Sequence, residues 1–154
     1  MTPIKARSYA HLSELIDKSI AEYGKACDLN HIDVSGIDDM SNLFRGLRFS
    51  GDISKWDTSN VKDMSQMFEE SRFLGDIFKW TTSRLKYMCW MFEDCAFDGD
   101  ISNWNTGNVT SMEFMFTDSA FNGDISQWDV SKVTNMGAMF RNTRFNGDLS
   151  KWNT

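Results

Sequence analysis

The chain has 154 residues, a length that fits one domain. Apolar residues make up 41% of it and charged residues 25%, which is ordinary for a folded protein and excludes a disordered tail. The net charge of −6 argues against nucleic-acid binding, because proteins of that class carry a basic face for the phosphate backbone. An acidic chain permits a basic protein partner instead.

A helix is expected at the start of the chain, over residues 8–25. Ser8 stands where an N-cap residue belongs, and Gly24 fits the C-terminal end. A repeat array needs a terminal cap with one polar face, so we interpret residues 1–27 as an N-terminal capping helix. A helix that docks on a partner or a membrane surface is the alternative. Its apolar side chains follow helical spacing at Tyr9, Leu12, Leu15, Ile16, Ile20 and Tyr23.

Targeting signals are the next feature of the N-terminal region. The first thirty residues hold no apolar segment typical of a signal peptide. No apolar run in the chain approaches the roughly 18 residues of a membrane span. We therefore expect a cytoplasmic protein without a membrane span. The alternative is a cell-surface location, if a leader has been removed.

A pattern of 24 residues repeats from about residue 28 to the C-terminus. Its first block reads Phe-x-Gly-Asp-Ile-x-x-Trp-x-Thr, and its second block reads Val-x-x-Met-x-x-Met-Phe. One such unit cannot bury its own apolar face, so consecutive units must stack into a continuous core. The period is plainest in two columns, Phe49, Phe73, Phe97, Phe121 and Phe145, and Trp56, Trp80, Trp104, Trp128 and Trp152.

The two blocks predict two kinds of element. Trp and Thr of the Trp-x-Thr segment are two residues apart and would share one face of a short strand. The apolar positions of the second block fit one face of a short helix or of a 3₁₀-rich turn, with Ser59 and its equivalents as N-caps. We therefore predict an α/β repeat fold. It is a right-handed, leucine-rich-repeat-like solenoid of about five 24-residue units over residues 28–154, preceded by the capping helix.

Residues 121–140 read Phe-Asn-Gly-Asp-Ile-Ser-Gln-Trp-Asp-Val-Ser-Lys-Val-Thr-Asn-Met-Gly-Ala-Met-Phe. This string resembles the repeat of the BspA-like leucine-rich repeat family, also called the bacterial surface protein repeat. The resemblance covers about four-fifths of the chain. It implies a non-catalytic repeat domain of a kind that is often displayed on surfaces and used in adhesion or recognition.

An aspartate follows the repeat glycine in every full unit. Stacked carboxylates could hold calcium through their oxygens, but each unit offers only one. We favour aspartates that accept hydrogen bonds from the backbone of their own turns. The column consists of Asp28, Asp52, Asp76, Asp100, Asp124 and Asp148.

The remaining metal-binding and catalytic residue types are sparse. Cys27, Cys89 and Cys95 form no Cys-x-x-Cys pair, so a zinc site is not expected, and a Cys89–Cys95 disulfide would need an oxidising compartment. His11 and His31 have no partnered nucleophile in the sequence. We expect no catalytic residues, no metal and no cofactor, and hence a protein that is not an enzyme.

Aromatic residues that the repeat does not require indicate a binding site. Trp90 and Phe114 occupy one column, and Tyr87 lies in a neighbouring column of the same block. Phe78 replaces a serine of the other full units. Aromatic residues dominate binding hot spots, so we expect these four side chains to anchor a partner. Burial under neighbouring segments or a dimer mate is the alternative.

Acidic residues follow the same block and would surround the aromatic side chains. Glu93 and Asp94 are the members that we assign to the partner-binding site, where they would steer a basic partner. A solvated polar face is the alternative interpretation. The predicted strand face, which carries Lys55, Lys79 and Lys151, is a second candidate site.

Together these patterns favour a protein-binding repeat module. A small acidic version suits an intracellular inhibitor, an immunity protein or an anti-defence protein. A fragment of a bacterial surface adhesin that binds host or cell-surface ligands is the alternative. The partner is expected to be another protein. The last unit, which stops at Thr154, would leave an open edge strand through which a homodimer could form.

Overall fold

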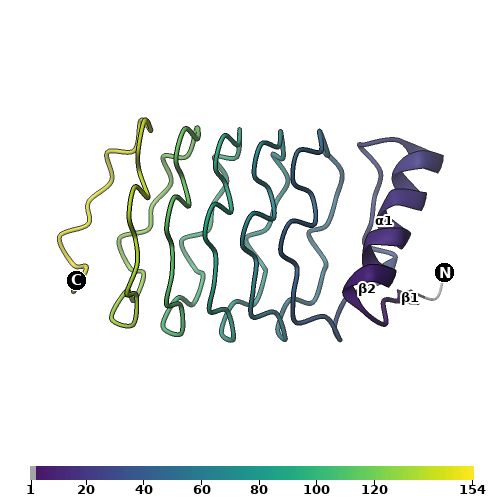
Figure 1. Ribbon diagram of the computed structural model, residues 1–154, viewed down its shortest axis with the longest axis horizontal. Coiled ribbons are helices and arrows are strands. Elements are labelled where there is room, and N and C mark those ends of the chain that lie inside the picture. The colour runs from purple at the N-terminus through teal and green to yellow at the C-terminus, as the bar shows by residue number, and fades with distance from the viewer. Residues whose placement is uncertain (1–2) are drawn as a thin grey trace.

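The computed structural model describes residues 3–154 (Figure 1). Strand β1 (Ile4–Lys5) comes first, followed by helix α1 (Tyr9–Tyr23) and strand β2 (Ile32–Asp33). β1 and β2 pair in parallel, with Ile4 opposite Ile32. Beyond β2 the backbone runs through similar turns that stack along the long axis of the molecule, with α1 at one end and the C-terminus at the other (Figure 1).

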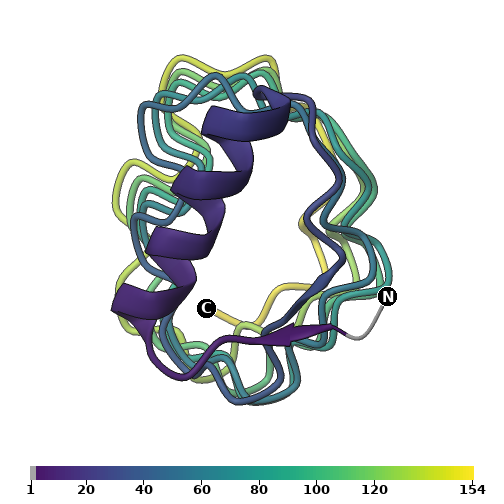
Figure 2. The same ribbon diagram turned by 90° about the vertical axis from the view of Figure 1, so that its right-hand side faces the viewer.

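Helix α1 confirms the helix predicted near the N-terminus. The Ser8 hydroxyl accepts a hydrogen bond from the backbone N–H of His11, and Gly24, at φ 83°, donates its N–H to the carbonyl of Ile20. Leu12 and Ile16 are fully buried and join the core of the repeats. Figure 2, a view along the stack, shows α1 lying along one side of the repeat outline.

The second block of each repeat is not a helix, which corrects the sequence-based prediction. In the unit of Met64 and Phe68, two residues have a positive φ, Gln66 at 60° and Glu70 at 54°. Alternate N–H groups donate to the following repeat: that of Met64 to Tyr87 at 3.0 Å and that of Phe68 to Met91 at 3.0 Å. The N–H groups between them donate within the unit, as that of Met67 does to the carbonyl of Met64, so turns and bonds between units replace the helical ladder. Ser59 accordingly caps no helix, and its own N–H donates to Asp57.

The Trp-x-Thr segment is also not a strand beyond β2, so the prediction of parallel strands there is wrong for the later units. Side-chain donors hold that side of the stack together instead. The indole Nε1–H of Trp80 donates to the carbonyl of Ile53 in the preceding repeat at 3.2 Å. The Thr82 hydroxyl donates to the carbonyl of Asn105 in the following repeat at 3.2 Å and accepts the N–H of Asn105 at 2.8 Å.

Parallel backbone bridges lie elsewhere, in the column just before the first repeat methionine. They join Asp39 to Asp63, Asp63 to Tyr87, Tyr87 to Ser111, and Ser111 to Asn135. The C-terminal residues 145–154 likewise form no strand, so the predicted edge strand is wrong. A turn stands there, and the indole of Trp152 donates to the carbonyl of Ile125 at 3.1 Å.

The core consists of aromatic rings stacked in register from one repeat to the next. Phe68 and Phe92 stack with centroids 5.7 Å apart, and Phe73 and Phe97 with centroids 6.1 Å apart. The repeat glycine permits this packing, because a Cβ added at Gly99 would lie 2.6 Å from the ring of Phe97. The repetitive 24-residue units and their stacked Trp and Phe are therefore confirmed.

We predict that Thr82→Val destabilises the protein by about 2 kcal/mol, because it keeps the shape of the side chain but leaves the N–H of Asn105 without its acceptor. Thr81→Val, one residue earlier on an exposed side chain, should change the stability by less than about 0.5 kcal/mol. Urea-induced unfolding of both variants measures the difference. Equal losses in the two variants would contradict the role given to the Thr82 hydroxyl.

Candidate protein-binding surface

Trp90 and Phe114 form a stacked pair outside the core. Their ring centroids are 5.3 Å apart and the ring planes differ by 5°. Both side chains are half-buried, each partly covered by the other, which differs from the full burial of the core rings. The pair thus presents a continuous aromatic surface that spans two consecutive repeats.

The backbone conformation of this pair is unusual for aromatic residues. Trp90 and Phe114 each have φ 54°, in the left-handed region that bulky side chains avoid. A non-glycine residue there costs about 1 kcal/mol or more. Small or polar residues fill the same column in the other units, namely Asn42, Gln66 and Ala138.

Bonds between repeats hold the pair in place. The N–H of Trp90 donates to the carbonyl of Glu113, and the N–H of Phe114 donates to the carbonyl of Gly137, both at 2.9 Å. The carbonyl of Trp90 accepts the N–H of Glu93 at 3.2 Å. These bonds fix the backbone that carries both rings before any partner arrives.

The other two predicted aromatic residues lie apart from this stack. Tyr87 is 45% exposed, and its backbone bridges to Asp63 and Ser111. Phe78 is 37% exposed and follows Asp76, whose carboxylate accepts its N–H at 2.9 Å. Among the rings of residues 3–154, Trp90 and Phe114 stack on each other, and neither Tyr87 nor Phe78 joins them.

Acidic side chains gather on the residues that follow the aromatic pair. Glu93 is half-buried, and desolvation raises its pKa above the ordinary value of 4.5, with a further contribution from the charges of Glu69, Asp118, Glu70 and Asp94. These five carboxylates therefore act on one another electrostatically. The surface beside the pair is negatively charged.

Part of this charge is already compensated at one end of the acidic group. Arg45 forms an ion pair with Glu69 at 2.7 Å, and Gln66 donates to the same carboxylate at 2.6 Å. Glu93 and Asp94 have no ion pair in the part of the chain that the structure describes. The two acidic residues assigned from sequence are thus available to a cationic partner.

The aspartate column behaves as turn aspartates do. The carboxylate of Asp100 accepts the N–H of Ser102 at 2.9 Å, and this bond lowers the pKa of Asp100. Asp52 and Asp124 make the same contact with Ser54 and Ser126. Within residues 3–154, no group of three or more histidines, cysteines, aspartates and glutamates is arranged to hold a metal ion.

The role of the second candidate face, which was predicted from the sequence, stays a prediction. Lys55, Lys79 and Lys151 are all exposed.

Three other cations, which the repeat pattern did not single out, line a hollow of about 280 Å³: Lys62, Arg84 and Lys86. The sequence contains one sign of this hollow, because a lysine, Lys86, recurs one repeat after Lys62.

The contact between α1 and the first repeat contains another cavity, of about 400 Å³, lined by Tyr23, Cys27, Asp28 and His31. Burial raises the pKa of the Cys27 thiol, which disfavours the reactive thiolate. The ring nitrogens of His31 face the carbonyl of Asp28 and the hydroxyl of Ser19 rather than a thiol. This geometry provides no activated nucleophile.

The stacked, nearly identical units define a repeat protein of the leucine-rich-repeat-like kind. The model of the family described as "Mycoplasma protein of unknown function, DUF285" matches residues 12–118 and again residues 71–154. The chain belongs to this family. No curated protein and no solved structure matches it significantly. Among residues 3–154, α1 falls short of the length and hydrophobicity that a membrane-spanning helix requires.

We predict that Glu93→Gln stabilises the protein at pH 7 by up to about 1 kcal/mol. The folded-state pKa of Glu93 is raised, so folding favours its protonated form, and stability is lost as the pH rises from the unfolded-state pKa through the folded-state pKa. The gain of the variant should therefore vanish below the ordinary value of 4.5.

Thermal unfolding of wild type and Glu93→Gln across this pH range tests the prediction. Glu14→Gln on α1 removes the same charge from an exposed residue and is the matched control. A gain for Glu93→Gln that persists at acid pH would show that ionisation of this carboxyl is not the cause.

Proposed function

We propose that this protein is a non-enzymatic protein-binding module built as a right-handed, leucine-rich-repeat-like solenoid. It binds its partner through Trp90, Phe114 and the acidic residues beside them. The observation that carries the proposal is the strained position of the pair. Two large aromatic residues occupy left-handed backbone positions on the surface, where other units have asparagine, glutamine or alanine. A conformational cost at a surface position supports a role in binding.

The chemistry of the surface favours a basic segment of a partner protein. Arginine and lysine side chains stack on aromatic faces, and each ring of the stacked pair has one face that the other ring does not cover. Glu93 and Asp94 would pair with the same cations. Tyr87, which is exposed three residues before Trp90, would extend the contact. Phe78 lies half a repeat before Trp90, and we propose it only as a contact at the edge of this surface.

An intracellular inhibitor, an immunity protein or an anti-defence protein is the role that we favour, and a cytoplasmic location accompanies it. The acidic surface next to the aromatic pair supports it, because a negative potential steers and orients a positively charged partner protein. The resemblance to the BspA-like surface repeat supports the second candidate, an adhesin fragment at the cell surface. A homodimer through the C-terminal unit stays a prediction.

The experiment uses a double variant that leaves the fold intact. Trp90→Asn/Phe114→Asn places in both positions the residue found at Asn42, which has the same backbone conformation. Relief of the left-handed strain offsets the lost ring contact, so stability should remain within about 1 kcal/mol of wild type. Affinity for the partner should fall at least tenfold, as expected for a hot spot of roughly 2 kcal/mol.

Capture from lysate of the source cells, followed by calorimetry with the purified partner, provides the readout. Phe78→Ser restores the serine of the other full units and serves as the control on the far part of the repeat. Loss of binding in the double variant alone supports the proposal. Equal binding by wild type and the double variant refutes this surface, and no capture from the lysate favours the adhesin.

A further inference from the structure

A cationic hollow lies on a different column of the repeats from the aromatic pair. It has a volume of about 280 Å³ and is lined by Lys62, Ser83, Arg84, Lys86 and Asn108. Three of these five residues are positively charged and none is acidic. In a chain with a net charge of −6, such a concentration of positive charge in one concave place requires an explanation.

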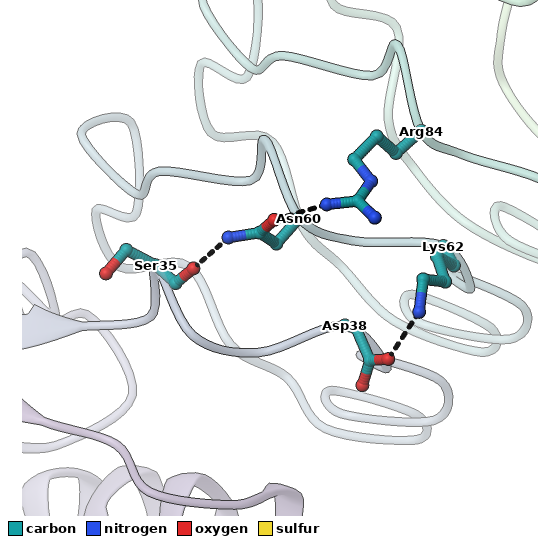
Figure 3. Close-up of polar contacts among 5 residues, drawn as sticks. All are labelled: Ser35, Asp38, Asn60, Lys62 and Arg84. Atoms are coloured by element: carbon teal, nitrogen blue, oxygen red, sulfur yellow. Dashed lines mark hydrogen bonds and ion pairs between the residues drawn. The ribbon is translucent and has the colours of Figure 1, made fainter.

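Arg84 is held in position by a neutral partner. The amide of Asn60 donates its Nδ2–H to the carbonyl of Ser35 at 2.6 Å, and its Oδ1 accepts the Nη1–H of Arg84 at 2.7 Å (Figure 3). The Ser35 carbonyl therefore fixes which end of the amide faces the guanidinium. Because the acceptor is uncharged, Arg84 is oriented while its positive charge remains uncompensated.

Lys62 is the one lining cation with an acidic partner. Its ammonium contacts Asp38 at 2.9 Å, with side chains 44% and 62% exposed, respectively (Figure 3). An ion pair this exposed contributes little and is easily rearranged. The hydrogen bond from the Lys62 ammonium lowers the pKa of Asp38, and the positive charge of Arg84 lowers this pKa further. Three cations and one carboxylate leave a charge of about +2 at the hollow, since lysine and arginine remain protonated near neutral pH.

The same arrangement recurs two repeats further along. Asn108, which lines the hollow, donates to the carbonyl of Ser83 at 2.8 Å and accepts the ammonium of Lys132 at 2.7 Å. A carbonyl, an asparagine and a cation thus follow one another in both places. Lys132 adds another positive charge next to the hollow, again held by a neutral amide.

We propose that the hollow between Lys62, Arg84 and Lys86 is a binding site for the phosphate or sulfate group of a small ligand. A tetrahedral dianion matches the excess charge and accepts hydrogen bonds from several directions. A guanidinium and two ammonium groups are the donors that bind such oxyanions. In the described part of the chain only Nη1 of Arg84 is hydrogen-bonded, so its other N–H donors remain for the ligand.

Isothermal titration calorimetry with inorganic phosphate, pyrophosphate and sulfate tests the proposal on the full chain. We expect saturable binding with one site. Arg84→Gln and Lys86→Gln should each weaken it at least about tenfold, the effect of losing a charged hydrogen bond. Lys18→Gln removes the same charge from an exposed position on α1 that does not line the hollow, and it should bind as wild type does.

The pH dependence distinguishes the two kinds of ligand. Inorganic phosphate loses one negative charge when the pH falls below its second pKa of roughly 7, and a phosphate monoester does so below roughly 6, whereas inorganic sulfate keeps both of its charges. Tighter binding of phosphate that weakens at acid pH identifies a phosphate ligand, and tighter, pH-independent binding of sulfate identifies a sulfate ligand. No saturable binding, or equal weakening by Lys18→Gln and Arg84→Gln, overturns the proposal.

Discussion

The structure depends on hydrogen bonds that reach one repeat away. A unit of 24 residues here contains neither a helix nor a regular strand, and several backbone N–H groups of its second block find acceptors in the next unit. The N–H groups of Met88, Phe92 and Asp94 all donate to the following repeat, at 3.3, 3.0 and 3.0 Å. Buried backbone groups cannot go unpaired without a large cost. Register between units is therefore fixed, because a shift by one residue would break every such bond at once.

That constraint explains which parts of the fold were predictable. The period, the stacked aromatic core and the turn aspartates follow from composition at fixed spacing, and α1 follows from its cap residues. The conformation of the second block was not predictable, because its apolar spacing fits a helix face as well as a series of turns. The apolar residues of one such block are Val61, Met64, Met67 and Phe68. Single short helices are marginal, whereas the neighbouring repeat offers acceptors for every alternate N–H. The Trp-x-Thr segment was wrongly predicted as a strand, because the indole of Trp and the hydroxyl of Thr make the hydrogen bonds between units that backbone groups would make in a sheet.

The candidate site was predictable to a similar degree. Trp90 and Phe114 stood out because the repeat does not require them, and identical register then placed their rings face to face. The left-handed backbone conformation of these two residues could not be predicted from the sequence, because no unit has a glycine in this column. Tyr87 and Phe78 were grouped with them by sequence proximity alone. The cationic hollow escaped notice for a physical reason: it combines side chains from residues 62 to 108, and the neutral contacts of Asn60 and Asn108 appear only when the units are stacked.

A stack in perfect register also determines how such a protein can carry function. Each outward column is a line of side chains at nearly constant separation, so substitutions at neighbouring repeats create surfaces without altering the core. Two aromatic residues in one column stack on each other, carboxylates three and four residues further along each unit add negative charge, and cations from two other columns surround a hollow. The scaffold tolerates this variation because inter-repeat backbone bonds, rather than the outward side chains, hold each unit in place. Outward side chains can thus differ between repeats while the contacts that stabilise each repeat stay the same.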